Sequence, residues 1–287
     1  MTGHASVENK AAAPGNFNDY LEQTCIARQT NLCVGLDPDV ARLRALAGVP
    51  DMPPPRLCLE AMFQAAAAAE PFAAAFKPNA AFFEAVETDE PLMARVGHHL
   101  AEKHTSVIRL ADAKRGDIGN TSARYAEATF QGQAFQSITV NPLMGHDAVE
   151  PFLRDPARGV FLLCLTSNPG ADDFLLQNEL YLRIAEKAAA WNTNHNVGLV
   201  VGATRPEYLG RVREIAPDLP LLIPGVGAQG GSLAETVEAI GGRENRRFLI
   251  NASRAVLYPA DATWANYTEQ VAAAARSLRD EINACVQ

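Results

Sequence analysis

The most constraining feature of this sequence is a repeated alternation of short apolar runs with helix-like segments. Eight runs of strand length occur, at Leu32–Leu36, Ala73–Phe76, Ser106–Ala111, Ser137–Val140, Val160–Leu165, Val197–Val201, Leu221–Ile223 and Phe248–Ile250. Helical patterns lie between and after them, at Arg56–Ala69, Thr121–Phe130, Leu175–Trp191, Pro206–Ile215, Ser232–Ile240 and Trp264–Cys285. Eight strand-then-helix units predict an α/β fold, specifically a closed (β/α)8 TIM barrel.

The periodicity alone leaves one alternative open, which is a doubly wound open sheet. A two-domain nucleotide enzyme would usually show a linker at the domain boundary, and the sequence contains no such linker. A length of 287 residues suits one barrel domain. We therefore expect a flexible N-terminal segment over residues 1–15 and a single catalytic barrel over residues 16–287.

Composition narrows the class of partner. A formal net charge of -8, without a basic stripe that carries aromatic residues, argues against nucleic acid as a partner. The start of the chain does not resemble a signal peptide, and no apolar stretch approaches the ~20 residues of a membrane span. The five cysteines lack metal-site spacing and suit free thiols in a reducing compartment. These features predict a cytoplasmic protein that binds a small molecule and no membrane.

Charged and polar residues follow most of the predicted strands. In a TIM barrel the active site lies where strands end and loops begin, so these residues are expected to meet around one site. The candidates, in chain order, are Asp37, Lys77, Asp112, Lys114, Asp117, Ser167, Pro224, Gln229 and Arg254.

The end of the third strand carries the densest charge. Asp112 and Lys114 stand two residues apart, so they point to the same side of a strand, and Asp117 falls in the loop just beyond. A structural ion pair would also explain an acid and a base at this spacing. The charges that follow the other strands favour a catalytic site.

The glycine-rich loop after the seventh strand is a candidate phosphate site. Residues 225–231 precede a helix expected to begin at Ser232, so free backbone N–H groups could hold an anion. The G-x-G-x-x-G spacing also imitates a dinucleotide fingerprint, but the next apolar run is followed by Asn251 rather than by the ribose-binding acid. Phosphate sites in barrels commonly use the loops after strands seven and eight, where Gln229 and Arg254 lie.

The run Asp112-Ala113-Lys114-Arg115-Gly116-Asp117-Ile118 resembles the D-x-K-x-x-D motif of the orotidine 5'-phosphate decarboxylase family. Phe76-Lys77-Pro78-Asn79, Thr166-Ser167-Asn168-Pro169-Gly170 and the loop from Pro224 to Gly231 resemble the longer bacterial subgroup of that family. The resemblance extends from Leu32 to Arg254. Ser253 departs from it, because many relatives are expected to carry glycine there.

The resemblance implies decarboxylation of orotidine 5'-monophosphate to uridine 5'-monophosphate, with neither a metal nor an organic cofactor. Lys114 would stabilise a carbanion-like C6 and protonate it, while Asp112 would lie beside the departing carboxylate. Lys77 and Asp37 would complete the charge network and bind the ribose hydroxyls.

The resemblance also assigns the remaining candidates. Asp117 and Thr121 would reach into the site of a neighbouring subunit, which implies a homodimer. Ser167 would recognise the base. The other substrate-binding residues would be Pro224, Gln229 and Arg254, of which the last two would bind the phosphate.

Three other functions remain to be distinguished. Metal-dependent sugar-phosphate decarboxylases and aldolases of related barrels carry a similar strand end, but they hold magnesium with additional acids. A Schiff-base enzyme would use Lys77 or Lys114 with a lowered pKa, which surrounding acids oppose. A nucleotide-binding barrel without catalysis would keep the phosphate site alone.

Overall fold

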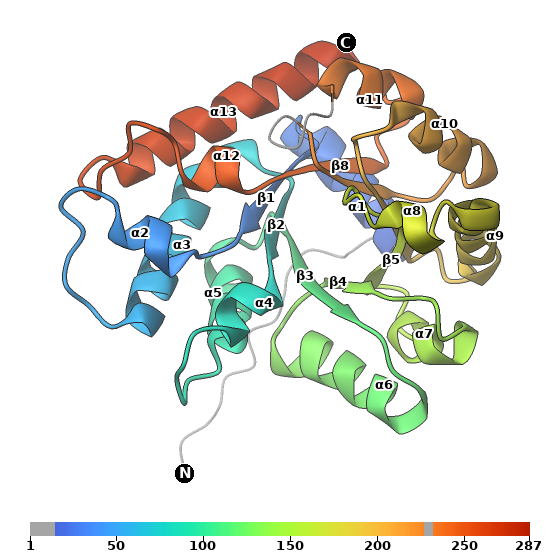
Figure 1. The fold of residues 1–287 in the computed structure, drawn as a ribbon, viewed down its shortest axis with the longest axis horizontal. Helices are drawn as coiled ribbons and strands as arrows, with labels where there is room; N and C mark the ends of the chain where they lie inside the picture. Colours follow the sequence, from blue (N-terminus) through green and yellow to red (C-terminus); the bar gives the residue numbers. More distant parts are fainter. Residues whose placement is uncertain (1–14, 227–231) are drawn as a thin grey trace.

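The computed structural model describes residues 15–226 and 232–287, and within them eight parallel strands form a closed barrel (Figure 1). The strands are β1 (Leu32–Leu36), β2 (Ala75–Pro78), β3 (Ile108–Arg115), β4 (Ser137–Val140), β5 (Gly159–Leu165), β6 (Val197–Val201), β7 (Leu221–Pro224) and β8 (Phe248–Ala252). Each strand pairs with the next, and β8 pairs with β1 through Leu32 and Ile250. The closure confirms the predicted TIM barrel and excludes the open sheet.

Helices surround the barrel in Figure 1. They are α1 (Phe17–Arg28), α2 (Val40–Arg44), α3 (Pro54–Ala69), α4 (Ala80–Glu84), α5 (Leu92–Lys103), α6 (Gly119–Glu127), α7 (His146–Leu153), α8 (Ala171–Phe174), α9 (Leu180–Trp191), α10 (Pro206–Ile215), α11 (Leu233–Ala239), α12 (Arg254–Leu257) and α13 (Tyr267–Val286). Short 3₁₀ segments lie at Glu70–Phe72 and Gln177–Glu179, and a π-helical turn spans Ala128–Gly132.

Helix α3 shows how the local sequence produces an element of the outer layer. It begins with Pro54, whose fixed φ suits the first turn of a helix, and it continues through an alanine run of high helix propensity. The buried Ala65, Ala66 and Ala69 carry small side chains on the face turned toward the core. Helix α3 also packs against α13, the long helix at the top of Figure 1.

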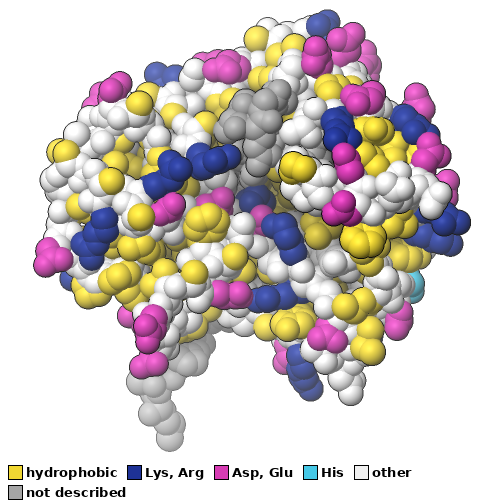
Figure 2. Space-filling view, in the orientation of Figure 1, with side chains coloured by type: hydrophobic (Ala, Val, Ile, Leu, Met, Phe, Trp, Pro, Cys, Tyr) yellow, Lys and Arg dark blue, Asp and Glu magenta, His cyan; other side chains and the backbone are white. Residues whose placement is uncertain are grey.

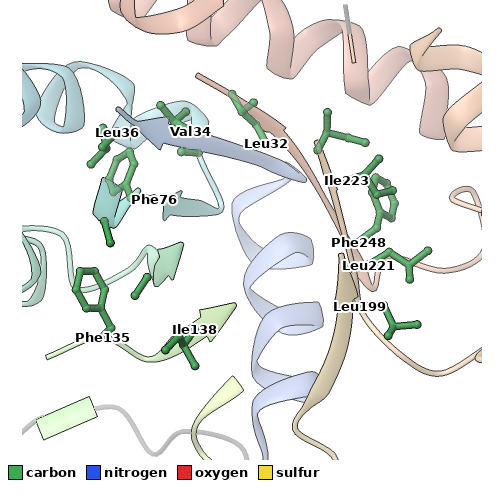
Figure 3. Packing of buried hydrophobic residues seen from close by; sticks show 14 of the residues in the cluster. Leu32, Val34, Leu36, Phe76, Phe135, Ile138, Leu199, Leu221, Ile223 and Phe248 are labelled. Atoms are coloured by element: carbon green, nitrogen blue, oxygen red, sulfur yellow. The ribbon is translucent and has the colours of Figure 1, made fainter. Parts of the chain in front are cut away.

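The apolar core consists of two layers. Side chains on the outer faces of the strands, such as Leu32, Val34 and Phe76, pack under the helices (Figure 3). A smaller core inside the barrel includes Cys33, Phe161 and Leu249. Successive strand residues therefore alternate between the two layers, which explains why the strands are apolar on both faces.

Helix α1 closes the N-terminal end of the barrel. Its N-cap Asn16 accepts a hydrogen bond from the Asp19 backbone N–H, and Phe17 packs edge-on against Phe161 at a centroid distance of 6.1 Å. Gly159 allows this contact, because a Cβ there would lie 2.2 Å from the Phe17 ring. The open end of the barrel is therefore the one where the strands terminate.

The part of the chain that the structure describes contains no helix long and apolar enough to cross a membrane. The flexible segment predicted at the N-terminus falls mostly on residues 1–14, which lie outside the described residues.

Candidate active site

A cavity of about 630 Å³ lies at the carboxyl ends of the strands. Figure 2 looks into this hollow and shows acidic and basic side chains together inside it. Seven of the predicted site residues line it, namely Asp37, Lys77, Asp112, Lys114, Ser167, Pro224 and Arg254. The barrel therefore brings together side chains that are more than 200 positions apart in the chain, as the strand-end pattern predicted.

Asp112 is the centre of the charge network. The Nζ of Lys77 lies 2.8 Å from Asp112 Oδ2, and the Nζ of Lys114 lies 2.6 Å from Asp112 Oδ1. Thr139 also donates a hydrogen bond from its hydroxyl to Oδ1, at 2.9 Å. Asp112 and Lys77 are 8% and 4% exposed, whereas the side chain of Lys114 is 48% exposed toward the cavity. Lys114 is thus the ammonium of the network that is most exposed to a bound ligand.

The buried members of the network are held in their charged forms. Burial alone would raise the pKa of Asp112, but the charges of Lys77 and Lys114 outweigh it and hold that pKa well below its ordinary range. Burial would lower the pKa of Lys77, but Asp112 and Asp37 outweigh it and raise that pKa. Both groups are therefore ionised at neutral pH, which does not suit a Schiff-base lysine.

Asp37 offers an unused acceptor at the edge of the network. It follows β1 and lines the cavity, and its charge acts on Lys77. Its Oδ1 atom is buried and has no hydrogen-bond partner among the described residues. Because buried polar atoms in native structures nearly always have a partner, this oxygen is suited to accept a hydrogen bond from a ligand hydroxyl.

Tyr258 fixes the loop that carries Asp37. Its hydroxyl accepts a hydrogen bond from the Asp39 backbone N–H at 2.7 Å and donates one to the Asp37 carbonyl at 2.8 Å. The guanidinium of Arg42 lies over the Tyr258 ring at 5.5 Å from its centroid. The loop after β1 is thus attached to the residues that follow β8, across the closure of the barrel.

The opposite wall of the cavity carries Ser167 and an apolar floor. Leu163, Val200 and Leu222 point inward from three neighbouring strands beneath Ser167. Gly202 makes room for this arrangement, since a Cβ there would lie 2.8 Å from the Cβ of Ser167. A flat, partly polar ring could lie on this floor with its edge toward Ser167.

The third side of the cavity is the predicted phosphate end. Pro224 ends β7, Gly225 has a φ of +98°, and the exposed Arg254 begins α12. A positive φ is the conformation that glycine adopts without strain. The predicted contact from Gln229 lies outside the described residues.

Ser253, which departs from the expected family pattern, lies against Gly35 of β1. The β1–β8 pairing matches Cys33 with Asn251 and Val34 with Ala252, so Gly35 lies across from Ser253. A Cβ on Gly35 would lie 1.9 Å from the Ser253 hydroxyl oxygen. Glycine at position 35 therefore creates the space that the serine side chain occupies.

Two predicted site residues do not line the cavity of their own chain. Asp117 lies in the loop after β3, and its Oδ1 accepts a hydrogen bond from the Ile118 N–H at 2.8 Å. Thr121 is exposed on α6. Neither residue belongs to the cavity lining within one chain.

Sequence reasoning missed Arg42, Thr139 and Tyr258, which all line the cavity. Thr139 could have been found, because Ser137 and Thr139 place polar groups on one face of an otherwise apolar strand. Tyr258 follows Arg254 by one helical turn, but nothing in its local sequence indicates contact with Asp39.

Comparison with known proteins identifies relatives along nearly the whole chain. Residues 30–265 match the orotidine 5'-phosphate decarboxylase / HUMPS family. An orotidine 5'-phosphate decarboxylase of Janthinobacterium sp. is 42% identical over 274 residues, which cover 93% of this chain and 98% of the relative. One from Bordetella avium is 43% identical over 277 residues, with 94% and 99% coverage.

Solved structures of similar proteins share the fold. The Leishmania donovani OMP decarboxylase has a TM-score of 0.77 and 37% identity, covering 94% of this chain and 98% of its own. A Toxoplasma gondii protein described as a putative orotidine-monophosphate-decarboxylase has a TM-score of 0.82 and 32% identity, with 95% and 96% coverage.

Proposed function

Because this chain belongs to the orotidine 5'-phosphate decarboxylase family, we propose that it converts orotidine 5'-monophosphate to uridine 5'-monophosphate with Lys114 as the proton donor. The arrangement of Lys77, Asp112 and Lys114 in the cavity supports this assignment most strongly. It offers one well-exposed ammonium, fixed by a buried carboxylate that a second, mostly buried ammonium keeps ionised.

The chemical step requires stabilisation of a localised negative charge. When the bond from C6 to the carboxylate breaks, CO2 leaves and the bonding electron pair stays on C6 in the plane of the ring. The ammonium of Lys114 would stabilise this pair and then donate a proton to it, forming the C6–H bond. The resulting neutral amine would regain a proton from water.

Asp112 would serve both Lys114 and the substrate. It holds the Lys114 ammonium at 2.6 Å, and an adjacent carboxylate favours the charged form of a lysine. In the bound state it would lie beside the substrate carboxylate, whose loss would relieve the repulsion between two like charges.

The rest of the cavity would bind the three parts of the nucleotide. Asp37 and Lys77 would contact the ribose hydroxyls, and Ser167 would face the base above the apolar floor. Pro224, Gln229 and Arg254 would form the phosphate end. Because the phosphate is remote from C6, its binding energy would be available to organise the site.

We also infer a homodimer in which Asp117 and Thr121 act in the partner's site. Both residues lie outside the cavity of their own chain, near the end of the barrel where the strands terminate. Three large apolar side chains in the loops after β3 and β4 are more than half exposed, namely Ile118, Leu143 and Met144. Exposed apolar side chains that gather beside a site are typical of a surface covered by another protein.

Mixing two inactive variants tests this arrangement. A hybrid of Lys114→Ala and Asp117→Ala chains would contain one site with both native residues, so refolding them together at equal amounts should restore about a quarter of wild-type activity. Each variant refolded alone is the control. If Asp117 acts in its own chain, the mixture will stay as inactive as its components.

The activity itself is tested by the ultraviolet absorbance change of orotidine 5'-monophosphate in excess chelator. We expect rapid conversion to uridine 5'-monophosphate. If activity appears only with magnesium and a sugar phosphate, the metal-dependent alternative is correct. Nucleotide binding without turnover under either condition would indicate a non-catalytic barrel.

We further propose a cytoplasmic location. All five cysteines are free thiols, and four of them are buried. Free cysteines are typical of proteins in reducing compartments.

A further inference from the structure

We propose that Thr139 is a positioning residue, whose hydroxyl holds the backbone of Lys114 and the carboxylate of Asp112 in the geometry needed for proton transfer. This inference rests on the role of Lys114 proposed above. Thr139 is itself 1% exposed and lies on β4, the strand beside the catalytic one.

The irregular pairing of β3 with β4 is the first observation that points to Thr139. Ala111 pairs with Ile138, and the next pair is Arg115 with Val140. Strand β3 therefore advances four residues while β4 advances two. Such a bulge leaves the extra residues outside the regular ladder and redirects their side chains. Lys114 lies within this bulge.

The backbone of Lys114 is the second observation. Its φ is +45°, in the left-handed region that residues other than glycine rarely adopt. Such conformations persist only where the surroundings enforce them, and they gather at functional sites. The conformation turns the Lys114 side chain toward Asp112 and the cavity.

One hydroxyl group provides this constraint. The Lys114 N–H, displaced from the ladder, donates to Thr139 Oγ1 at 2.9 Å, and the same hydroxyl donates to Asp112 Oδ1 at 2.9 Å. The Nζ of Lys114 contacts that same carboxylate oxygen at 2.6 Å. Thr139 thus links the backbone of the proton donor to the carboxylate that orients its ammonium.

The Thr139→Val variant removes the hydroxyl and keeps the shape, while Thr139→Ser keeps the hydroxyl. For Thr139→Val we expect kcat to fall about 10- to 100-fold, because displacing a reacting group by about 1 Å can lower the rate by up to about 100-fold. Its KM and its affinity for uridine 5'-monophosphate should stay within about threefold of wild type, since Thr139 is 1% exposed and its hydroxyl is already hydrogen-bonded to Lys114 and Asp112. Thr139→Ser should restore most of kcat.

Thr30 offers a matched control at the closed end of the barrel. Its buried hydroxyl also accepts from a backbone N–H, that of Leu32 at 3.1 Å, and donates to the Phe72 carbonyl at 2.8 Å. Thr30→Val should lose comparable stability in urea unfolding but keep kcat. The inference is overturned if Thr139→Val keeps kcat, if Thr30→Val loses as much kcat, or if Thr139→Ser does not recover it.

A crystal structure of Thr139→Val tests the inference independently of activity. We expect Lys114 to leave the positive φ region and its Nζ to move away from Asp112. A Lys114 that keeps its conformation would refute the positioning role. An inactive wild-type enzyme would instead refute the proposed reaction, and the crystal structure would still decide the role of Thr139.

Discussion

Replacing Lys114 with alanine is expected to lower kcat by at least about 10⁴-fold, because the enzyme loses both its proton donor and the charge that stabilises the anion at C6. Binding of uridine 5'-monophosphate should be largely kept, since phosphate and base contacts lie elsewhere in the cavity. Single-turnover kinetics with orotidine 5'-monophosphate and calorimetric titration with the product measure the two effects separately.

Lys103→Ala is the matched control for this experiment. Lys103 ends α5 and pairs with Glu102, and its side chain is 58% exposed. That variant should keep wild-type turnover. Substantial residual activity in Lys114→Ala would exclude Lys114 as the proton donor.

The second large effect concerns stability. Lys77→Met is expected to lower the free energy of unfolding by about 3–5 kcal/mol, because it removes one partner of a buried ion pair and leaves Asp112 with less compensation. Activity should fall as well, since Asp112 would no longer be fixed on one side. The urea midpoint at pH 7 measures the stability loss.

The pH dependence follows from the directions of the two pKa shifts. The folded pKa of Asp112 lies below its ordinary value of 3.8. The stability that ionised Asp112 contributes to the fold is therefore complete above pH 3.8 and is lost as pH falls through the folded pKa. The folded pKa of Lys77 lies above its ordinary value of 10.5. The stability that charged Lys77 contributes to the fold is therefore lost only as pH rises through that higher value. The stability difference between wild type and Lys77→Met should therefore be constant around neutrality and shrink in acid.

A surface replacement again provides the control. Lys103→Met changes the same side chain where it is exposed, and such substitutions usually alter stability by no more than about 0.5 kcal/mol. If Lys77→Met unfolds at the same urea concentration as Lys103→Met, the buried pair does not stabilise the fold.

The sequence predicted the barrel because apolar runs determine strands directly. β1, β4 and β6 begin and end where the pattern placed them, as does α10. The pattern works at these positions because strands that are buried on both faces consist mostly of apolar and β-branched residues. The site candidates followed from the same pattern, since polar residues that end such strands have only one end of the barrel to occupy.

The sequence could not predict features that depend on contacts between distant elements. Strand β3 was expected to end at Ala111, but it extends to Arg115, because Arg115 still pairs with Val140 of β4 beyond a bulge. Helix α1 was not predicted, because it depends on contacts with the N-terminal end of the barrel, where Phe17 packs against Phe161. The contact of Tyr258 with Asp39 likewise exists only after β8 closes on β1.

The close approach of Gly35 and Ser253 means that two positions share a single volume. With serine at position 253, just after β8, even the smallest side chain at position 35 would overlap it. With glycine at position 253, as expected in many relatives, that volume becomes vacant and position 35 of β1 has room for a side chain. The identity of residue 35 is therefore constrained by a residue 218 positions later in the chain, so that a side chain at position 35 is tolerated only together with a glycine at position 253.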